Sequence, residues 1–199
     1  MRGDDHQTDR PTLWITGETC GLGPLRRDLV ELYWQWENEL RVMVGNGRQT
    51  PESLDQRAEG LEHQMKRTDS QARFTIYDTT GPEPIPVGTC ELVIQHRWRN
   101  AEFFIVLGSG HRAKGIGTEA TRLTLDYAFH ITNLRNVYLT VLAPNTAGVK
   151  AYEKAGFRVI GTRRQSGYWL GEPCDEILMD AIKDDYPGPS TVRRISGLD

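Results

Sequence analysis

The chain has 199 residues, of which 38% are hydrophobic and 26% are charged, and its formal net charge is −3. These values are typical of one folded domain and exclude an intrinsically disordered chain. A non-specific nucleic-acid binder is normally basic, so we expect no nucleic-acid partner. No apolar stretch reaches the length of a membrane span, so we expect no membrane partner and a cytoplasmic protein.

The first third of the chain predicts one strand and two helices. Residues 13–25 read as a strand with a glycine-rich exit, and a long helix follows from Pro24. Its apolar face, spaced at three- and four-residue steps, consists of Leu25, Leu29, Leu32, Trp36, Leu40 and Met43. Thr50 and Pro51 then predict the start of a second helix, with a hydroxyl N-cap and proline at the first helical position.

The remainder of the chain predicts an α+β domain. An antiparallel meander of three strands is expected over residues 72–78, 87–96 and 101–108. A helix, a strand, a short helix and a closing hairpin follow, at residues from 116, at 136–144, at 145–156 and at 157–182. We therefore predict a single domain over residues 12–183, with flexible tails at residues 1–11 and 184–199.

A glycine-rich turn between a strand and a helix, VLGSGHRAKGIGTE at residues 106–119, is the main candidate for a phosphate site. No glycine there is followed by Lys and Ser or Thr, which excludes a Walker A loop. Gly108 to Ala113 satisfies the dinucleotide pattern G-x-G-x-x-G/A, but the acid that should follow at the end of the next strand, Asp126, falls in a predicted helix. Glycines 115 and 117 instead place bare main-chain amides at a helix N-terminus, beside Arg112 and Lys114, which favours a pyrophosphate.

The stretch RAKGIG at residues 112–117 resembles the R/Q-x-x-G-x-G/A motif of the GNAT superfamily of N-acetyltransferases, which binds the pyrophosphate of acetyl-CoA. Residues 145–157, NTAGVKAYEKAGF, are similar to the second signature of that family. Residues 90–108 and 167–182 resemble its Rim-type branch, which includes ribosomal-protein, spermidine and antibiotic acetyltransferases. The resemblance covers about residues 12–182 and implies the GNAT fold, with a central, mostly antiparallel sheet flanked by helices.

The resemblance also implies acetyl-CoA as co-substrate and a set of residues that bind it. These cofactor-binding candidates are Ile105, Val106, Leu107, Arg112, Ala113, Lys114, Gly115, Ile116, Gly117, Thr118, Asn145 and Lys154. Counting from Asn145, Tyr152 stands where the family keeps the tyrosine that protonates the departing thiolate. Glu102, at the start of the strand before the turn, is the candidate that accepts the proton of the amine.

The acceptor is expected to be a primary amine of a small molecule, such as an antibiotic or a polyamine. Aromatic and acidic side chains would suit a cationic amine, and the candidates are Trp34, Glu37, Glu91, Tyr168 and Trp169. Two alternatives stay open, which are acetylation of protein N-termini and a non-catalytic acyl-CoA-binding module. Members of the family often form dimers or larger rings, so a homo-oligomer is also expected.

Metal and disulfide chemistry find no support in the sequence. Cys20, Cys90 and Cys174 are odd in number and far apart, which predicts free thiols. The five histidines lack the spacing of metal ligands, so no metal site is predicted.

Overall fold

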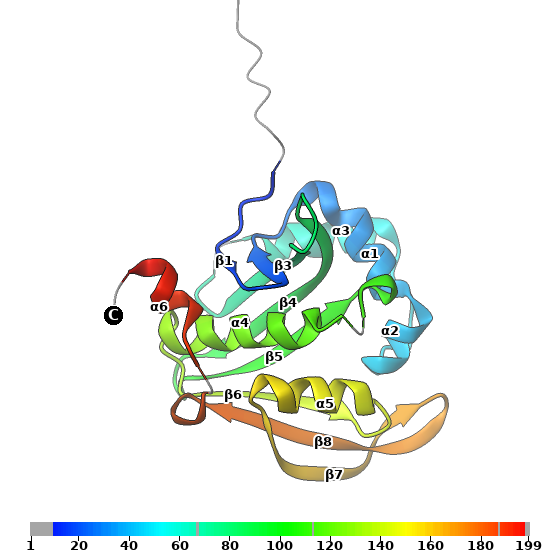
Figure 1. The fold of residues 1–199 in the computed structure, drawn as a ribbon. Helices are drawn as coiled ribbons and strands as arrows, with labels where there is room; N and C mark the ends of the chain where they lie inside the picture. The colour runs from blue at the N-terminus through cyan, green and yellow to red at the C-terminus, as the bar shows by residue number, and fades with distance from the viewer. Residues whose placement is uncertain (1–9, 67, 113, 187, 198–199) are drawn as a thin grey trace, which may run out of the picture.

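The computed structural model describes residues 10–66, 68–112, 114–186 and 188–197. Its centre is one mixed sheet of eight strands in the order β1-β2-β3-β4-β5-β6-β8-β7. The strands are β1 (Ile15–Thr16), β2 (Cys20–Gly23), β3 (Gln71–Asp78), β4 (Ile85–Gln95), β5 (Asn100–Leu107), β6 (Asn136–Leu142), β7 (Arg158–Trp169) and β8 (Glu172–Ile182). Neighbouring strands are antiparallel except β5 and β6, which are parallel. The α+β prediction is therefore confirmed (Figure 1).

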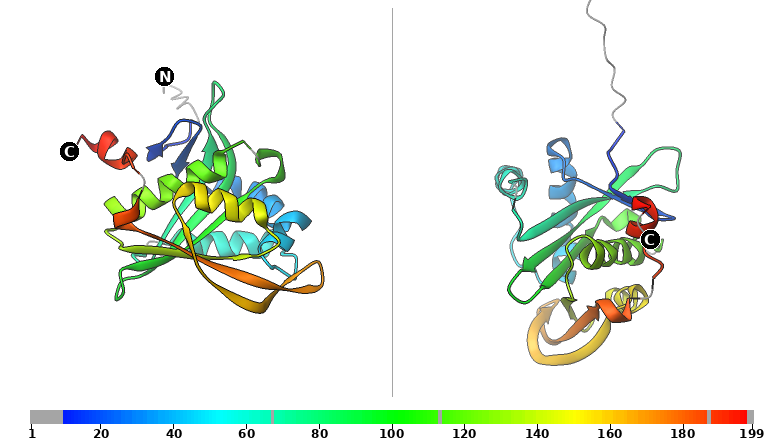
Figure 2. Two further views of the ribbon diagram at one scale, coloured as in Figure 1. Left: turned by 60° about the horizontal axis from the view of Figure 1, so that its bottom comes forward. Right: turned by 90° about the vertical axis from the view of Figure 1, so that its left-hand side faces the viewer.

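Helices cover both faces of this sheet (Figure 2). The α-helices are α1 (Val30–Asn38), α2 (Leu40–Gly45), α3 (Leu54–Gln64), α4 (Ile116–His130), α5 (Thr146–Ala155) and α6 (Thr191–Ser196). Short 3-10 turns occupy Arg27–Leu29, Ser109–His111 and Lys183–Asp185. Among the described residues, none of these helices combines the length and the apolar character needed to cross a bilayer.

Two apolar cores lie on opposite faces of the sheet. The larger one joins α4 to the meander, where Ile116, Ala120 and Leu123 are buried, as their helical spacing predicts. The smaller one joins α1 and α3 to the other face through Tyr33, Trp36 and Leu61. The Tyr33 hydroxyl lies 2.5 Å from the hydroxyl of Thr75 on β3, which ties α1 to the sheet.

The predicted long helix after Pro24 is wrong, because it is broken at Glu39. This residue has an extended conformation (φ −61°, ψ 126°) between α1 and α2. Its carboxylate accepts a hydrogen bond of 3.0 Å from the main-chain N–H of Ser109, in the turn after β5. A contact with a distant segment thus accompanies the break, and periodicity within the helix cannot reveal such a contact.

Two other predicted boundaries also need correction. The second helix begins after Ser53 and not after Thr50, because Ser53 and Gln56 form a reciprocal capping box. The single strand expected over residues 13–25 is a hairpin of β1 and β2, and its turn is held by the carboxylate of Glu119 from α4. That carboxylate accepts hydrogen bonds from the amides of Glu18, Thr19 and Cys20 at 2.5, 2.7 and 3.0 Å.

The segment that follows β8 contains α6, which packs against α4, while the flexibility expected for the tail at residues 184–199 stays a prediction. Val192 of α6 is buried, and its amide donates a hydrogen bond of 2.8 Å to the buried carboxylate of Asp126 on α4. The hydroxyl of Ser190 donates to the same carboxylate at 2.6 Å. The buried acid therefore fixes α6 against α4, while the domain limits of 12 and 183 stay a prediction.

Candidate active site

The parallel strands β5 and β6 separate after three residue pairs. Their register pairs Asn100–Glu102 with Asn136–Tyr138, whereas β5 continues to Leu107 and β6 to Leu142. From Phe103 onward, β5 is paired only with β4, so one edge of its main chain has no strand partner among the described residues. An extended ligand can hydrogen-bond to such an edge as an added strand does. This edge contains the predicted cofactor contacts Ile105, Val106 and Leu107.

The glycine-rich turn follows this free edge and leads into α4. Gly115 has a left-handed conformation (φ 82°, ψ −16°) at the N-cap of the helix, where no side chain caps the first amides. A Cβ atom at Gly117 would lie 3.1 Å from Cδ1 of Leu107, so a larger side chain would not fit without rearrangement. Ile116 is buried in the core, which fixes the first turn of the helix.

The charges of the turn favour an anion at this helix end. Arg112 donates from Nε and Nη2 to the carbonyl of Leu107, at 3.2 Å each, and so ties the turn to β5. Lys114 is exposed next to Gly115. Uncapped amides, the positive end of the helix dipole and two cations fit a diphosphate. Ala113 lies outside the described residues, so its predicted contact is left as a prediction.

Tyr152 lies on α5 and faces the separated strands. Its ring packs edge-to-face against Phe103 of β5, with ring centroids 6.4 Å apart, and against Phe157 at 6.0 Å. Burial raises the pKa of Tyr152 to about 12, although the nearby charge of Arg112 lowers it in part. The fold thus brings the predicted acid and the predicted anion-binding turn to the same end of the sheet, although 40 positions separate them along the chain.

Asn145 and Lys154 occupy the two ends of α5. The side chain of Asn145 accepts a hydrogen bond of 3.1 Å from the amide of Gly148, which caps the helix as the sequence predicts. Lys154 is exposed, and its carbonyl accepts a hydrogen bond of 2.5 Å from Arg122 of α4. The two helices that flank the gap are therefore held to each other.

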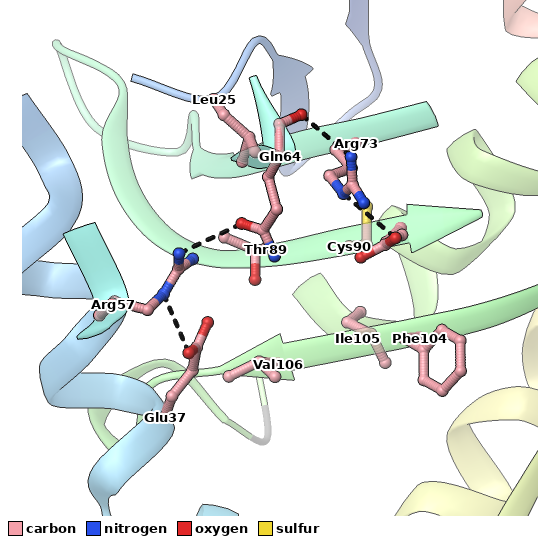
Figure 3. A pocket seen from close by; sticks show the side chains of 11 residues that line it. Leu25, Glu37, Arg57, Gln64, Arg73, Thr89, Cys90, Phe104, Ile105 and Val106 are labelled. Carbon is pink, nitrogen blue, oxygen red and sulfur yellow. Dashed lines mark hydrogen bonds and ion pairs between the residues drawn. The ribbon is translucent and has the colours of Figure 1, made fainter. Parts of the chain in front are cut away.

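A cavity of about 110 Å³ lies on the opposite face of β4 and β5, beneath α1 and α3 (Figure 3). Its walls combine residues from five elements and the segment before α1, namely Leu25, Glu37, Arg57, Gln64, Arg73, Thr89, Cys90, Glu91, Phe104, Ile105 and Val106. Ile105 and Val106 belong both to this wall and to the free edge of β5. The cavity therefore adjoins the gap between the strands.

Two ion pairs line this cavity. Nε of Arg57 lies 3.0 Å from the carboxylate of Glu37, and Nε of Arg73 lies 3.1 Å from that of Glu91. Arg57 also stands over the ring of Tyr33, with 5.4 Å between the guanidinium carbon and the ring centroid. Burial raises the pKa of Glu37, and the positive charge of Arg57 lowers it in part. The predicted acceptor residues Glu37 and Glu91 are thus brought together, but each is paired with a cation.

Comparison with known proteins identifies this arrangement. A family model described as an acetyltransferase (GNAT) domain matches residues 21–158, which is more than half of the chain. The chain belongs to the GNAT family of acetyltransferases. It is accordingly an N-acetyltransferase, which transfers an acetyl group from acetyl-CoA to an amine.

Individual relatives of this GNAT chain include polyamine enzymes. Spermidine N(1)-acetyltransferase of Escherichia coli K12 is 29% identical over 166 residues, which cover 83% of this chain and 87% of the relative. The Vibrio cholerae enzyme of the same name is 34% identical over 136 residues, which cover 68% and 76%. The crystal structure of spermidine N-acetyltransferase from Vibrio cholerae in complex with CoA and spermine matches with a TM-score of 0.77 at 26% identity, covering 86% of this chain and 100% of that one.

Four other predicted site residues of this GNAT enzyme lie outside the cavity wall. Trp34 donates a hydrogen bond of 2.6 Å from its indole to the carbonyl of Glu52 and so anchors the segment before α3. Tyr168 and Trp169 lie at the end of β7, in the closing hairpin. Glu102 lies on β5 opposite Val93 and Tyr138, on the sheet face of Phe104, at the point where β5 and β6 begin to separate. The structure brings none of these four to the cavity among the residues that it describes.

The arginines of the cavity beneath α1 and α3 are the functional candidates that sequence reasoning missed. Arg57 lies one turn before Leu61, on the apolar face of α3, and is only 4% exposed. Helical spacing assigns Arg57 to the buried face of its helix. A cation at such a position could have indicated a functional residue from the sequence alone. Arg73 faces Glu91 in the register of β3 and β4, which requires knowledge of the strand pairing.

Cysteine and metal chemistry are not indicated by the described residues. The three cysteines are free, and burial raises the pKa of the Cys90 thiol to about 12, which disfavours the reactive thiolate. No group of three or more His, Cys, Asp and Glu side chains suited to a metal ion occurs in the described ranges.

Proposed function

We propose that this enzyme acetylates the primary amine of a small molecule, and that Tyr152 donates a proton to the departing thiolate of CoA. The observation that carries the proposal is the position of Tyr152, which packs on Phe103 where β5 and β6 separate and lies close enough to Arg112 for its charge to act on the phenol. Acetyl-CoA supplies the activated acetyl thioester. The chain supplies position, hydrogen bonds and proton transfer.

The two faces of the sheet divide these tasks in the proposal. The free edge of β5 and the uncapped amides of α4 would hold the pantetheine arm and the diphosphate. Main-chain N–H groups of β5 would also stabilise negative charge that develops on the thioester oxygen. The acceptor would enter from the cavity on the other face, which shares Ile105 and Val106 with this edge.

Proton transfer needs one group on each side of the gap. A primary amine is mostly protonated near pH 7 and must lose a proton before it attacks. Glu102 lies outside the cavity wall but on the same face of the sheet, at the start of the gap, and is the proposed acceptor of that proton through water. Tyr152 remains a neutral phenol well above pH 7 because its pKa is raised, so it keeps the proton that the thiolate requires. The nitrogen loses its second proton as the amide forms, and this proton would restore the phenol of Tyr152.

A small acceptor is favoured over a polypeptide by the size and polarity of the cavity. Its volume is about 110 Å³, and two ion pairs lie in its wall. The relatives named spermidine acetyltransferases also support a small-molecule amine. Acetylation of protein N-termini would need an opening for an extended chain.

The test is thiol release from acetyl-CoA in the presence of a panel of small amines and a panel of peptides. We expect release with small amines and a loss of about 100-fold in turnover for Tyr152→Phe. Acetylation of peptides alone would overturn the small-molecule proposal. Unchanged turnover in Tyr152→Phe would remove Tyr152 from the mechanism.

A further inference from the structure

The charged groups of the acceptor cavity sum to zero. Its wall contains two carboxylates, Glu37 and Glu91, and two guanidinium groups, Arg57 and Arg73. A third cation, Arg48, stands 3.7 Å from Glu37 and 2.8 Å from Glu52. A site for a polycation needs an excess of negative charge, because each ammonium group must regain the solvation that it loses on burial. This cavity has no such excess.

The two guanidinium groups are held in fixed positions by one residue, Gln64 of α3. Nη1 of Arg57 donates to its side-chain oxygen at 3.2 Å, and Nη1 of Arg73 donates to its main-chain carbonyl at 3.0 Å. Figure 3 shows the two arginines approaching Gln64 from opposite sides, with Thr89 of β4 between them. Since Nε of each arginine faces a glutamate, both guanidinium planes are oriented before any ligand binds.

This arrangement leaves several hydrogen-bond donors of the cavity wall without an acceptor. Within the described part of the chain, Nη2 of Arg57, Nη2 of Arg73 and the hydroxyl of Thr89 make no hydrogen bond, since each arginine uses Nη1 toward Gln64 and Nε toward a glutamate. A guanidinium group has five N–H donors, and its preferred additional partner is a carboxylate, which accepts charge-assisted hydrogen bonds. Among the described residues, the second oxygens of Glu37 and Glu91 likewise accept no hydrogen bond and can receive an amine.

We infer that the acceptor is a zwitterion of the amino-acid class, whose carboxylate is recognised by Arg57 and Arg73 next to the amine that is acetylated. This inference rests on the proposed small-molecule acetylation and narrows it. A zwitterion matches a neutral cavity in which both signs of charge are present. A polyamine would instead place several ammonium groups near two fixed guanidinium groups, and like charges in a partly buried site repel one another.

The first experiment compares acceptors that differ only in the carboxylate. Thiol release from acetyl-CoA is measured with leucine, leucinamide and isoamylamine, with the corresponding phenylalanine set, and with spermidine. We expect kcat/KM for each amino acid to exceed that for its amide and its decarboxylated amine by about tenfold or more, which corresponds to ~1.4 kcal/mol. The amino groups of the amides are less basic, so a larger fraction of them is neutral and able to attack. A preference for the amino acids would therefore arise in spite of this advantage of the amides.

The outcomes separate this inference from the proposed function. Acetylation of isoamylamine or spermidine as fast as leucine, or faster, would overturn the zwitterion while leaving small-molecule acetylation in place. If acetyl-CoA binds but no small amine releases thiol, the proposed function fails and the inference fails with it.

The second experiment removes the guanidinium group of α3. Arg57→Met should lower kcat/KM for leucine about tenfold or more relative to kcat/KM for isoamylamine, which has no carboxylate. Arg57→Lys keeps the charge and should restore part of the preference. The matched control is Arg27→Met, because Arg27 pairs with Glu62 on the exposed surface.

A binding measurement keeps this test independent of turnover and of folding. Calorimetric titration of leucine into the CoA-saturated enzyme should show binding that Arg57→Met weakens about tenfold, while the affinity for acetyl-CoA and the melting temperature show that the variant is folded. Equal loss for leucine and isoamylamine in a folded Arg57→Met variant would overturn the role of Arg57.

Discussion

The proposed cofactor side and the proposed acceptor cavity are built from the chain in opposite ways. The cofactor side uses one continuous run from Ile105 to Thr118, and Tyr152 joins it from α5. The cavity takes one to three residues from each of α1, α3, β3, β4 and β5, and Leu25 from the segment before α1, so its wall is spread over residues 25–106. Main-chain groups dominate the first region and side-chain charges dominate the second. A region of the first kind depends on where glycines fall, whereas one of the second kind depends on how distant segments pack.

The largest expected effect comes from filling the helix end of the cofactor side. Gly117→Trp places a bulky ring where a Cβ atom already meets Leu107 at 3.1 Å, and it covers the first amides of α4. We expect the affinity for acetyl-CoA to fall on the order of 100-fold or more, because the diphosphate loses its hydrogen bonds. Isothermal titration calorimetry measures this directly.

The control is a glycine on the acceptor side of the molecule. Gly60 on α3 has open space around its Cβ position, so Gly60→Trp should bind acetyl-CoA as the wild type does. If Gly117→Trp bound acetyl-CoA with wild-type affinity, the assignment of the diphosphate site to this turn would be wrong.

The next largest effect is expected for Tyr152→Phe, which should lower turnover without weakening the binding of acetyl-CoA. Tyr152→Phe removes a proton donor and keeps the ring that packs on Phe103. We expect kcat to fall about 100-fold while the affinity for acetyl-CoA stays within twofold. An equal loss in both quantities would make Tyr152 a structural residue.

The pH dependence of the wild-type rate tests the assignment of Tyr152 as the proton donor. Because the pKa of Tyr152 is raised to about 12, the phenol stays protonated through the neutral and mildly alkaline range. The rate should therefore rise as the amine loses its proton and should not fall before about pH 11. An alkaline decline centred near pH 8 would assign the acid to another group.

An intermediate effect is expected on the cavity side. Glu37→Gln leaves Arg57 without its carboxylate and should lower kcat/KM for the acceptor about tenfold, with unchanged affinity for acetyl-CoA. Glu62→Gln, at the exposed pair with Arg27, is the matched control and should change neither quantity. Weakened acetyl-CoA binding in Glu37→Gln would show that the two regions are not independent.

The smallest effect concerns stability. Burial alone raises the pKa of Glu119, but hydrogen bonds from Thr19, Glu18 and Cys20 outweigh it, and the pKa is lowered in the folded protein. A lowered carboxyl pKa gives stability that is complete above the unfolded value of ~4.3 and is lost as the pH falls through the folded value. Glu119→Gln should therefore cost about 1–2 kcal/mol near pH 7 and much less near pH 3.

Thermal unfolding at the two pH values measures this difference. Glu153→Gln, at an exposed position of α5, provides the control and should not change the melting temperature. A constant difference between wild type and Glu119→Gln at both pH values would contradict the lowered pKa.

The same contrast explains what the sequence could and could not predict. The helix N-terminus at Ile116, the Asn145 cap and the strands of the meander follow from local spacing and capping, and they were predictable. The break at Glu39 and the anchoring of α6 by Asp126 depend on contacts across 70 and 66 positions, so no local pattern signals them. The ion pairs of the cavity fall in the same class, because each joins residues that only the fold brings together.

Amide hydrogen exchange with CoA alone, and then with CoA and leucine, shows where each of the two ligands binds. In the proposed arrangement, the main-chain amides from Gly115 to Thr118 bind the diphosphate, while the cavity beneath α1 and α3 binds the acceptor. We expect CoA alone to protect the amides of the turn and to leave α3 unchanged, and we expect leucine then to protect α3 and β4. Saturation with CoA without any protection between Gly115 and Thr118 would contradict this arrangement.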